Sequence, residues 1–470
     1  MPKSLLPRSF RKAIRTAGDT LERAALNSSA AKERGKSARH KIRMEWINPE
    51  ALTPDPANPR RHSPQQIRKI AADIRKNGFT NPILITLDGL VIAGHGRLEA
   101  SKQAGLTEVP VIRLHLTKAQ AKVRNLWDNR SSDLSDFDDQ LLGLAMQQLV
   151  DLNIDIEDTG FSVAESDLFI EGLSASGADP ADNDIPAAAG PAITKPGDIW
   201  LMGTHRIICA DAQSAASYAC LMDGKLAHAV FTDVPYNLAG GAISGRGKVR
   251  HRSFKMAAGE MSAERYRAFL RASIEQMARH SVDGSLHFHC IDWRHLQDIQ
   301  AAAEEIYREL LNMAVWVKPN GGMGSLYRSR HELVLVYKNG RGRHRNNVQL
   351  GRHGRNRSNV WEYAGGNSFS GRTTDEGNLL GLHPTVKPVQ MIADAILDCT
   401  ARGDLVLDPF LGSGSTVIAA ERVGRTCYGI DLDPLYVDVA VRRWQRHTGA
   451  HAVPAATGKR FDDVARGRRD

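Results

Sequence analysis

A glycine-rich segment near the end of the chain, Asp408–Thr416, constrains the fold more than any other feature. Its sequence is DPFLGSGST, and it follows an apolar run at 404–407 that is typical of a buried strand. A helical pattern at 416–423 comes next, and a further apolar run at 425–430 ends at an aspartate. A glycine turn from a strand into a helix lets the backbone approach a ligand, and this order is half of a nucleotide-binding βαβ unit. We therefore predict an α/β domain that binds its ligand at the carboxyl ends of its strands.

The glycine turn alone leaves several interpretations open. Gly412 and Gly414, followed by Asp431 at the end of the next strand, also suit a dinucleotide site. Val417 replaces the third glycine of that pattern. A phosphate-binding P-loop is disfavoured because no lysine precedes Ser415. A tight turn without any ligand is the remaining alternative.

A second loop, Asp233-Val234-Pro235-Tyr236, follows the apolar run 229–232. The exocyclic amino nitrogen of adenine or cytosine is a poor nucleophile because its lone pair is delocalised into the ring. A carboxylate at Asp233 and the backbone carbonyl of Val234 can each accept one of its hydrogens, while Tyr236 stacks on a flipped base. The loop therefore indicates chemistry on the amino group of a base, with a polar turn as the alternative.

Together the two loops resemble those of amino-group DNA methyltransferases. Residues 233–236 are similar to the catalytic Asp/Asn/Ser-Pro-Pro-Tyr/Phe/Trp motif, with Val234 at a position that contributes a carbonyl. Residues 408–416 resemble the S-adenosylmethionine loop of that family, and the segment HPTVKP at 383–388 resembles the one beside the methionine end of the cofactor. The catalytic loop comes first, which is the permuted order of the β-class enzymes, over about 197–447. A dinucleotide domain would instead build its remaining strands after the glycine loop.

This resemblance implies a role for each residue of the site. The expected catalytic residues are Asp233, Val234, Pro235 and Tyr236. The residues expected to bind S-adenosylmethionine are Asp211, Thr385, Lys387, Asp408, Phe410, Gly412, Gly414, Ser415, Thr416 and Asp431. Among them, Asp211 is expected to accept from the adenine amino group of the cofactor, and Asp431 from its ribose hydroxyls. Aspartate at 233 favours adenine N6 over cytosine N4 as the target, since enzymes of the latter kind usually carry serine there.

A smaller unit at about 46–116 has a pattern of its own. It contains an Asn-Pro-Arg turn at 58–60 and then the segments GFTNPILIT, VIAGHGRLEASKQAGL and VPVI. In this order they resemble the N-terminal domain of ParB and its relatives. In that family the glycine-rich loop carries basic residues and binds a nucleotide triphosphate. Arg97 is kept here, at the start of a helix where a phosphate can bind, whereas His95-Gly96 departs from the pattern, so nucleotide binding stays open.

The charge of the chain favours a polyanionic partner. The formal net charge is +9 and the pI is about 9.3. Two arginine-rich stretches lie between the catalytic and cofactor loops, and we expect double-stranded DNA as the partner. The side chains predicted to contact its phosphates are Arg246, Lys248, Arg250, Arg252, Arg343, Arg345 and Arg355. A homodimer is left open.

Other features argue against a metal site and a membrane segment. The five cysteines contain no CxxC pair, and His287 and His289 alternate along a predicted strand without a carboxylate cluster, so no metal site is expected. The chain has neither an apolar run of membrane-spanning length nor a signal-peptide core. We therefore expect a cytoplasmic protein without a membrane partner.

The predicted fold class is α/β: a Rossmann-like, S-adenosylmethionine-dependent methyltransferase sheet in circularly permuted order, preceded by a smaller α+β ParB-like domain. The predicted segments are a basic flexible tail (1–45), the ParB-like domain (46–116), a helical extension (117–173), a linker (174–196), the DNA methyltransferase domain (197–450) and a C-terminal tail (451–470). The expected function is site-specific methylation of a flipped base, of the kind found in restriction-modification. The alternatives are cytosine N4 methylation, a noncatalytic DNA-binding protein with a decayed methylase fold, which Val234 keeps open, and a nicotinamide-dependent enzyme.

Overall fold

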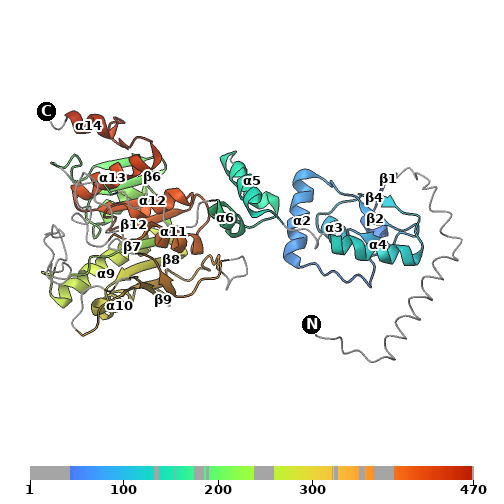
Figure 1. The fold of residues 1–470 in the computed structure, drawn as a ribbon, viewed down its shortest axis with the longest axis horizontal. Coiled ribbons are helices and arrows are strands. Elements are labelled where there is room, and N and C mark those ends of the chain that lie inside the picture. Colours follow the sequence, from blue (N-terminus) through green and yellow to red (C-terminus); the bar gives the residue numbers. More distant parts are fainter. Residues whose placement is uncertain are drawn as a thin grey trace, which may run out of the picture. The chain divides into compact units, whose positions relative to one another are not determined.

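The computed structural model describes residues 43–131, 137–152, 154–173, 185–186, 190–237, 259–319, 321, 326–348, 355–364 and 386–467. The chain forms two compact units (Figure 1), and the boundary falls between Asp136 and Phe137. The predicted basic tail lies outside the described residues up to position 42.

The first unit is built on a four-stranded sheet. Its strand order is β1 (Met44–Ile47), β4 (Val109–Arg113), β2 (Ile83–Ile85) and β3 (Val91–Ala93). Strand β4 runs antiparallel to β1 and parallel to β2, and β3 is antiparallel to β2. The helices of this unit are η3 (Pro49–Ala51), α2 (Pro64–Asn77), α3 (His95–Gln103) and α4 (Lys118–Ser131).

Local sequence signals explain the ends of helix α2. The Ser63 hydroxyl accepts from the backbone N–H of Gln66 at 3.1 Å, so a polar side chain caps the first turn. Pro64 occupies the first helical position, where its missing N–H costs nothing. Gly78 ends the helix with φ 78°, a conformation that glycine adopts without strain. Helix α2 therefore starts and stops where its capping residues require.

Helix α4 belongs to the first unit. The Asn125 side chain is buried and donates to the carbonyl of Ile92 in β3 at 2.8 Å. Helices α5 (Asp139–Asp151) and α6 (Val163–Gly172), with η5 (Ile156–Thr159) between them, belong to the second unit. The segment 117–173, which we expected to form one helical extension, is thus divided between the two units.

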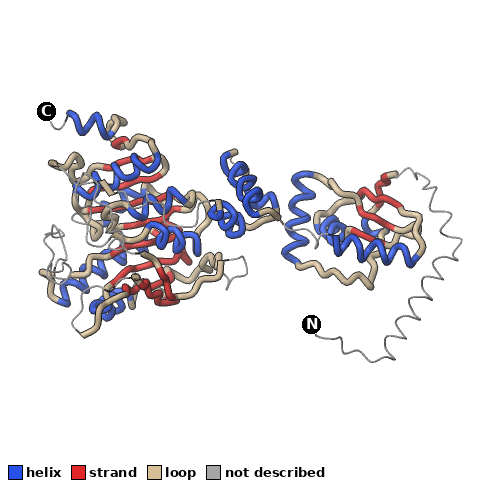
Figure 2. The backbone as a smooth tube through the Cα atoms, in the orientation of Figure 1, coloured by secondary structure: helices blue, strands red, loops and turns tan. Residues whose placement is uncertain are grey.

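The second unit contains a ten-stranded sheet with helices among its strands (Figure 2). The strand order is β11-β9-β10-β8-β7-β12-β13-β6-β5-β14. The strands are β5 (Ile199–Met202), β6 (His205–Cys209), β7 (Ala227–Asp233), β8 (Ser281–Ile291), β9 (Glu309–Val317), β10 (His331–Lys338), β11 (Val360–Glu362), β12 (Leu405–Asp408), β13 (Thr426–Asp431) and β14 (Val453–Pro454). Strands β8, β7, β12, β13 and β6 are parallel, whereas β10 and β5 run antiparallel to their neighbours β8 and β6. Strands β12 and β13, late in sequence, therefore complete the centre of the sheet beside β7, as the permuted order predicts.

Apolar side chains cover both faces of this sheet. In β7, Phe231 packs into a cluster with residues of α11, α12 and α13, and Val230 packs on the other face with residues of α7. Strands that are buried on both faces read as continuous apolar runs, which explains the pattern at 229–232. The helices of this unit, besides α5 and α6, are α7 (Ala215–Met222), α9 (Ala263–Arg279), η7 (Trp293–His295), α10 (Leu296–Ala303), α11 (Val389–Cys399), α12 (Ser415–Arg422), α13 (Pro434–Thr448) and α14 (Phe461–Gly467).

Helix α6 is fixed to the sheet layer by buried ion pairs. The Asp167 carboxylate contacts Arg425, just before β13, at 2.8 Å and Arg402 at 3.1 Å. The side chains of Asp167 and Arg425 are 2% and 0% exposed. These pairs lie at the amino ends of β12 and β13, so α6 is anchored at the sheet edge opposite the glycine loop. Among the described helices, none has the length and apolar character that crossing a membrane requires.

Candidate active site

Four acidic residues mark one edge of the large sheet. Asp233 ends β7, Asp408 ends β12, Asp431 ends β13, and Asp211 follows β6. The four strands are parallel and adjacent in the order β7-β12-β13-β6. Because parallel strands end at the same edge, the predicted catalytic and cofactor-binding loops come together there, where ligands bind in open α/β sheets.

The glycine loop is bonded to the end of strand β13. Leu411 N–H donates to the carbonyl of Ile430 at 3.0 Å, and Gly412 N–H donates to the Asp431 carboxylate at 2.8 Å. Gly414 has φ 81°, and a Cβ atom there would lie 2.9 Å from Cβ of Ala440. A larger residue at 414 would therefore strain the backbone and displace α13. The turn needs glycine for packing as well as for access to a ligand.

Hydrogen bonds made by the loop's own side chains stabilise its conformation. The buried Asp408 carboxylate accepts from the Thr416 hydroxyl at 2.6 Å and from Phe410 N–H at 3.1 Å. Burial raises the pKa of Asp408 to about 7. The buried Ser415 hydroxyl accepts from the Arg443 guanidinium at 3.0 Å. Asp408, Ser415 and Thr416 thus fix the shape of the predicted cofactor loop through their side chains.

The carboxylates of Asp431 and Asp211 each bond to nearby backbone. Asp431 accepts from Gly412 N–H and Asp433 N–H, both at 2.8 Å, and burial raises its pKa to about 7. Asp211 accepts from Gln213 N–H at 2.9 Å. Each carboxylate oxygen has two lone pairs, so both groups retain capacity to accept from a bound hydroxyl or amino group.

The catalytic loop is held by a buried lysine. Lys387, before helix α11, donates to the Asp233 carboxylate at 2.7 Å and to the Tyr236 hydroxyl at 3.1 Å. Tyr236 in turn donates to the other oxygen of Asp233 at 2.6 Å. We expected Lys387 beside the methionine end of the cofactor; the structure places its ammonium group on the predicted catalytic carboxylate.

Two further charged residues complete this cluster, and sequence reasoning missed both. Glu332 accepts from Lys387 at 3.1 Å, and Lys318 forms an ion pair with Glu332. Burial alone would raise the pKa of Glu332, but the attraction of Lys387 and Lys318 lowers it to about 2. Burial alone would lower the pKa of Lys387, but the attraction of Asp233 and Glu332 raises it. The cluster therefore holds Lys387 as an ammonium between two carboxylates.

The rest of the catalytic loop packs into the protein. Val234 is buried in an apolar cluster that includes Tyr266. The Tyr266 hydroxyl donates to the carbonyl of Pro235 at 2.7 Å. The Asn237 side chain bonds the backbone of Met261 through both its oxygen and its nitrogen. The residues on the C-terminal side of Val234 are thus anchored by hydrogen bonds.

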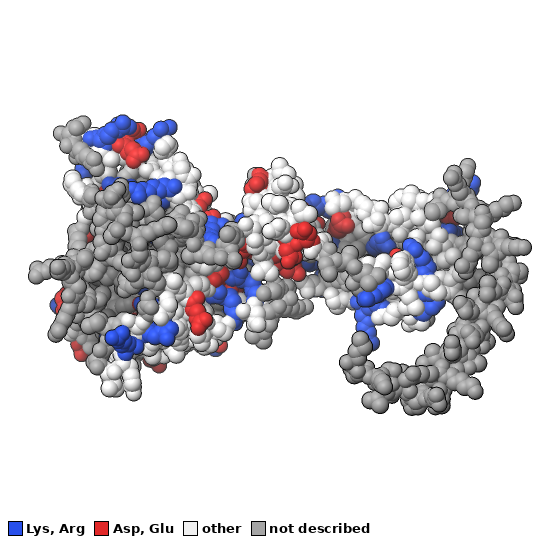
Figure 3. All heavy atoms as spheres, viewed as in Figure 1, with Lys and Arg blue, Asp and Glu red and all other residues white. Residues whose placement is uncertain are grey.

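The structure describes three of the seven side chains that we expected to contact DNA, namely Arg343, Arg345 and Arg355. Arg246, Lys248, Arg250 and Arg252, and the predicted cofactor residue Thr385, lie outside the described residues. Arg343 and Arg345 are exposed, but they follow β10, which is antiparallel to β8, and so lie at the edge opposite Asp233. Basic side chains reach the surface of both units (Figure 3).

The prediction that Arg355 contacts DNA is wrong. Its side chain is buried and forms ion pairs with Glu171 of α6 at 3.0 Å and with Asp398 of α11 at 3.1 Å. An arginine enclosed by carboxylates cannot reach a phosphate unless its buried ion pairs are broken. Arg355 instead belongs to the network that attaches α6 to the second unit.

In the first unit, Arg97 lies in the first turn of α3 and is half-buried, and this burial lowers its pKa. A Cβ atom at Gly94 would lie 3.1 Å from the Arg97 guanidinium. His95 accepts from the backbone N–H of Asp55 at 3.2 Å. Nucleotide binding at Arg97 stays a prediction. The described residues contain no group of three or more His, Cys, Asp or Glu side chains that could hold a metal ion.

Comparison with known proteins identifies the family. Residues 227–442 match the model described as DNA methylase. Type II methyltransferase M2.DpnII of Streptococcus pneumoniae is 30% identical over 230 residues, which are 46% of this chain and 81% of the relative. The chain belongs to the DNA methylase family. This membership confirms the predicted fold class and class of enzyme, an S-adenosylmethionine-dependent DNA methyltransferase.

The comparisons give two other similarities. Type II methyltransferase M2.LlaDCHI of Lactococcus lactis subsp. cremoris is 28% identical over 46% of this chain and 80% of the relative. Among solved structures, the M1.HpyAVI-SAM complex is 20% identical, covers 50% of this methylase and 97% of that chain, and has a TM-score of 0.37.

The N-terminal half of the methylase matches two further models. Residues 32–130 match the ParB N-terminal domain, as predicted, and residues 140–196 match the ParB-methyltransferase HTH domain. The second match includes α5 and α6, which sequence reasoning described only as helices. Gly143 in α5 is a signal of their close packing, because a Cβ atom there would lie 2.5 Å from the backbone oxygen of Phe169 in α6.

Proposed function

We propose that this methylase transfers a methyl group from S-adenosylmethionine to N6 of an adenine flipped out of double-stranded DNA at a defined sequence. The observation that carries the proposal is the position of Asp233, whose carboxylate is held by Lys387 and Tyr236 at the edge that the glycine loop also reaches. An aspartate at this position favours adenine over cytosine.

The cofactor supplies a methyl group on a positively charged sulfur, and the amino nitrogen of the base attacks it. In the proposed site, Asp431 accepts from the ribose hydroxyls and Asp211 from the adenine amino group of the cofactor. Asp233 and the Val234 carbonyl accept the two hydrogens of the target amino group, which aims the nitrogen's lone pair at the methyl carbon. The nitrogen–methyl bond forms as the sulfur–methyl bond breaks, and the surplus amino proton leaves through the hydrogen bond to Asp233.

Lys387 supports this role of Asp233. Two carboxylates in one buried cluster would repel each other, and the ammonium of Lys387 lies within 3.1 Å of both Asp233 and Glu332. Burial raises the pKa of Asp233, and the attraction of Lys387 opposes this rise. Lys387 therefore favours the ionised form of Asp233 and fixes its orientation, while each oxygen retains a lone pair for the target amino group.

The noncatalytic alternative rests on Val234, which lacks the rigidity of proline. The anchors at Pro235 and Asn237 supply that rigidity from outside the residue. The same loop keeps its carboxylate, its aromatic ring and the backbone carbonyl of Val234. These features favour an active enzyme over a decayed one.

Analysis of the methylated base tests the proposal. Purified protein is incubated with DNA and cofactor that carries a labelled methyl group, and the DNA is digested to nucleosides and separated by mass. We expect label in N6-methyladenosine. Label in N4-methylcytosine would contradict the choice of base, and absence of label from DNA would contradict the function. Sequencing that detects modified bases in DNA from expressing cells then gives the target sequence.

Binding of the cofactor is expected to depend on pH through Asp431. Its pKa of about 7 lies above the ordinary value, so the group is ionised above pH 7 and protonated below it. A carboxylate accepts from two hydroxyls better than a carboxylic acid does, so affinity should be highest above pH 7 and fall by up to about tenfold per unit below it. Titration calorimetry at pH values from 5.5 to 8.5 measures the affinity for the cofactor and hence this slope. A slope of about tenfold per pH unit corresponds to about one proton per site.

The variant Asp431→Asn is the matched comparison. It should bind the cofactor more weakly at pH 8, and its affinity should lose the part of the pH dependence that comes from residue 431. Titration of the cofactor itself affects the affinities of both proteins alike. Asp408 also has a pKa of about 7 and remains in the variant. An undiminished slope in Asp431→Asn would therefore assign the pH dependence to Asp408 and contradict the role of Asp431.

A further inference from the structure

The end of β9 and the start of β10 lie at the catalytic edge of the sheet. Strand β8 is parallel to β7, and β10 is antiparallel to β8, so β10 begins at the edge where β7 ends at Asp233. Beyond the two strands, Lys318 N–H donates to the carbonyl of Arg330 at 2.7 Å, and the Arg330 side chain donates to the carbonyl of Lys318 at 3.1 Å. These bonds extend the hairpin of β9 and β10 past the strand ends.

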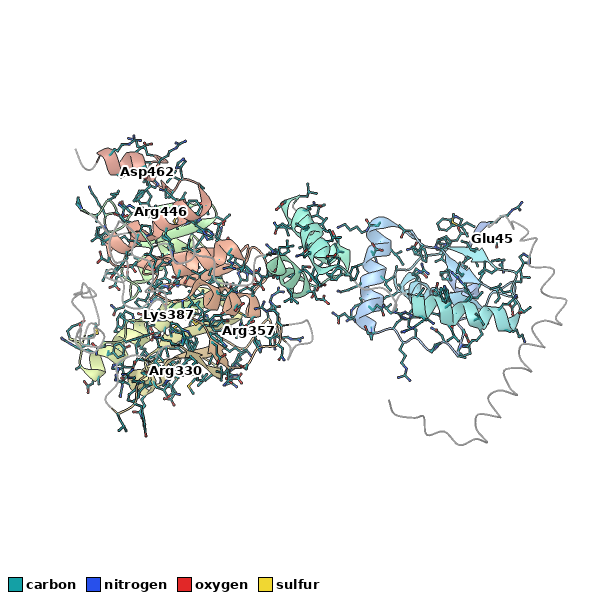
Figure 4. The ribbon with its side chains drawn as sticks, viewed as in Figure 1. Glu45, Arg330, Arg357, Lys387, Arg446 and Asp462 are labelled. Carbon is teal, nitrogen blue, oxygen red and sulfur yellow. The ribbon has the colours of Figure 1, made fainter. Side chains whose placement is uncertain are left out.

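A chain of contacts links this hairpin to the catalytic carboxylate. Lys318 forms an ion pair with Glu332, Glu332 with Lys387 at 3.1 Å, and Lys387 with Asp233 at 2.7 Å. Figure 4 labels Lys387 and Arg330, which lie in the same part of the second unit. The hairpin is therefore held at the site where a flipped base would enter.

The described end of the hairpin presents apolar and basic side chains together. Leu326 and Tyr327 are 82% and 83% exposed, the highest values for large apolar side chains among the described residues. Arg328 and Arg330 follow them and are exposed. Exposed apolar side chains beside a catalytic site indicate a partner surface. An aromatic ring suits stacking on a base, and arginines suit phosphates, so this combination fits nucleic acid.

Base flipping gives such a group a role. Extrusion of a base breaks its stacking and its pairing, and it leaves a hole in the duplex. Apolar side chains that enter a base stack offset the lost stacking, as in proteins that kink DNA with a wedge. We propose that Tyr327, with Leu326 beside it, enters the duplex and fills the space left by the target base, while Arg328 and Arg330 contact the flanking phosphates. This inference rests on the proposed function, since it assumes a flipped base at Asp233.

Trp293 is the rival for this role. It follows β8 at the same edge and is 53% exposed. The guanidinium of Arg294 covers its ring at 5.3 Å from the centroid, and Arg294 is itself bonded to Asp292. One face of the Trp293 ring is therefore occupied within the protein, which favours Tyr327.

Two duplexes that carry the mapped target sequence test the proposal. In one the target adenine is paired; in the other it lies opposite an abasic site, so little pairing energy opposes its extrusion. Tyr327→Ala should lower kcat/KM on the paired duplex by about tenfold or more, since stacking by one aromatic side chain accounts for about 5-fold to 150-fold. On the abasic duplex the decrease in kcat/KM should be below about threefold, because no base pair has to be broken before the adenine leaves the stack. Tyr327→Phe should resemble the wild type on both.

Controls separate this role from loss of structure. Leu226, which is 44% exposed and precedes β7 at the opposite edge, gives the matched variant Leu226→Ala, expected to leave both rates unchanged. Cofactor affinity and thermal unfolding of Tyr327→Ala should equal those of the wild type. Three results would overturn the inference. Tyr327→Ala could lower kcat/KM equally on the two duplexes, or on neither. Alternatively, Trp293→Ala instead of Tyr327→Ala could lower kcat/KM on the paired duplex alone. A wild-type protein that methylates neither duplex would overturn the proposed function, and the inference with it.

Discussion

Replacement of Asp233 by alanine is expected to lower the rate of methyl transfer by about 10²-fold to 10³-fold, because the reaction loses a preorganised acceptor at the atom where charge develops. The variant removes the carboxylate that Lys387 and Tyr236 hold in place. Cofactor affinity should change little, since Asp431 and the glycine loop lie on other strands. Transfer of labelled methyl to DNA measures the first quantity, and calorimetry with S-adenosylmethionine measures the second.

The buried cluster determines which controls this experiment needs. In Asp233→Ala, Lys387 keeps its ion pair with Glu332, so the variant should remain folded, and thermal unfolding checks this. Asp462→Ala, at an exposed position in α14, is the matched acidic control and should retain full activity. If the wild type and Asp233→Ala transfer methyl groups at the same rate, Asp233 is not the catalytic acceptor.

The sequence predicted those parts of the site that lie within one continuous segment. The loop Asp408–Thr416 shows its strand, its glycines and its helix in order, and the loop that begins at Asp233 follows a recognisable buried strand. The parallel arrangement of these strands then brings the loops to one edge. Local sequence and topology were sufficient for this result.

Residues that act through distant contacts could not be found in this way. Glu332 is separated from Asp233 by nearly a hundred positions and reaches the site only because β10 is antiparallel and begins at the catalytic edge. Its only local signal is a carboxylate in the apolar strand HELVLVYK, and an acid in a buried strand indicates a paired charge. Lys318 has no such signal.

The error at Arg355 has the same origin. An arginine-rich stretch gives the sign of the charge but not the groups around it, and Arg355 is enclosed by the acids of α6 and α11. Those acids lie on both sides of it in sequence, at Glu171 and Asp398. The pattern of one segment therefore cannot distinguish a phosphate contact from a buried anchor.

Those buried anchors lead to the largest expected effect on stability. Asp167→Ala should lower the free energy of unfolding of the second unit by about 3 to 5 kcal/mol, because it leaves the fully buried guanidinium of Arg425 without its carboxylate. Chemical denaturation followed by tryptophan fluorescence measures the change. The matched control is Glu305→Ala, which removes an exposed ion pair with Arg271 and should cost at most about 1 kcal/mol.

The same comparison tests how α6 is attached. If Asp167→Ala costs no more than Glu305→Ala, the buried pair does not stabilise the folded chain, and α6 is not fixed to the methylase sheet by Arg425. If the large loss is found, protease cleavage in α5 and α6 should also become faster in Asp167→Ala under native conditions, since the helix pair has lost a principal anchor. The helices that match the HTH model would then be a rigid part of the catalytic unit, positioned by charges at the sheet edge opposite Asp233.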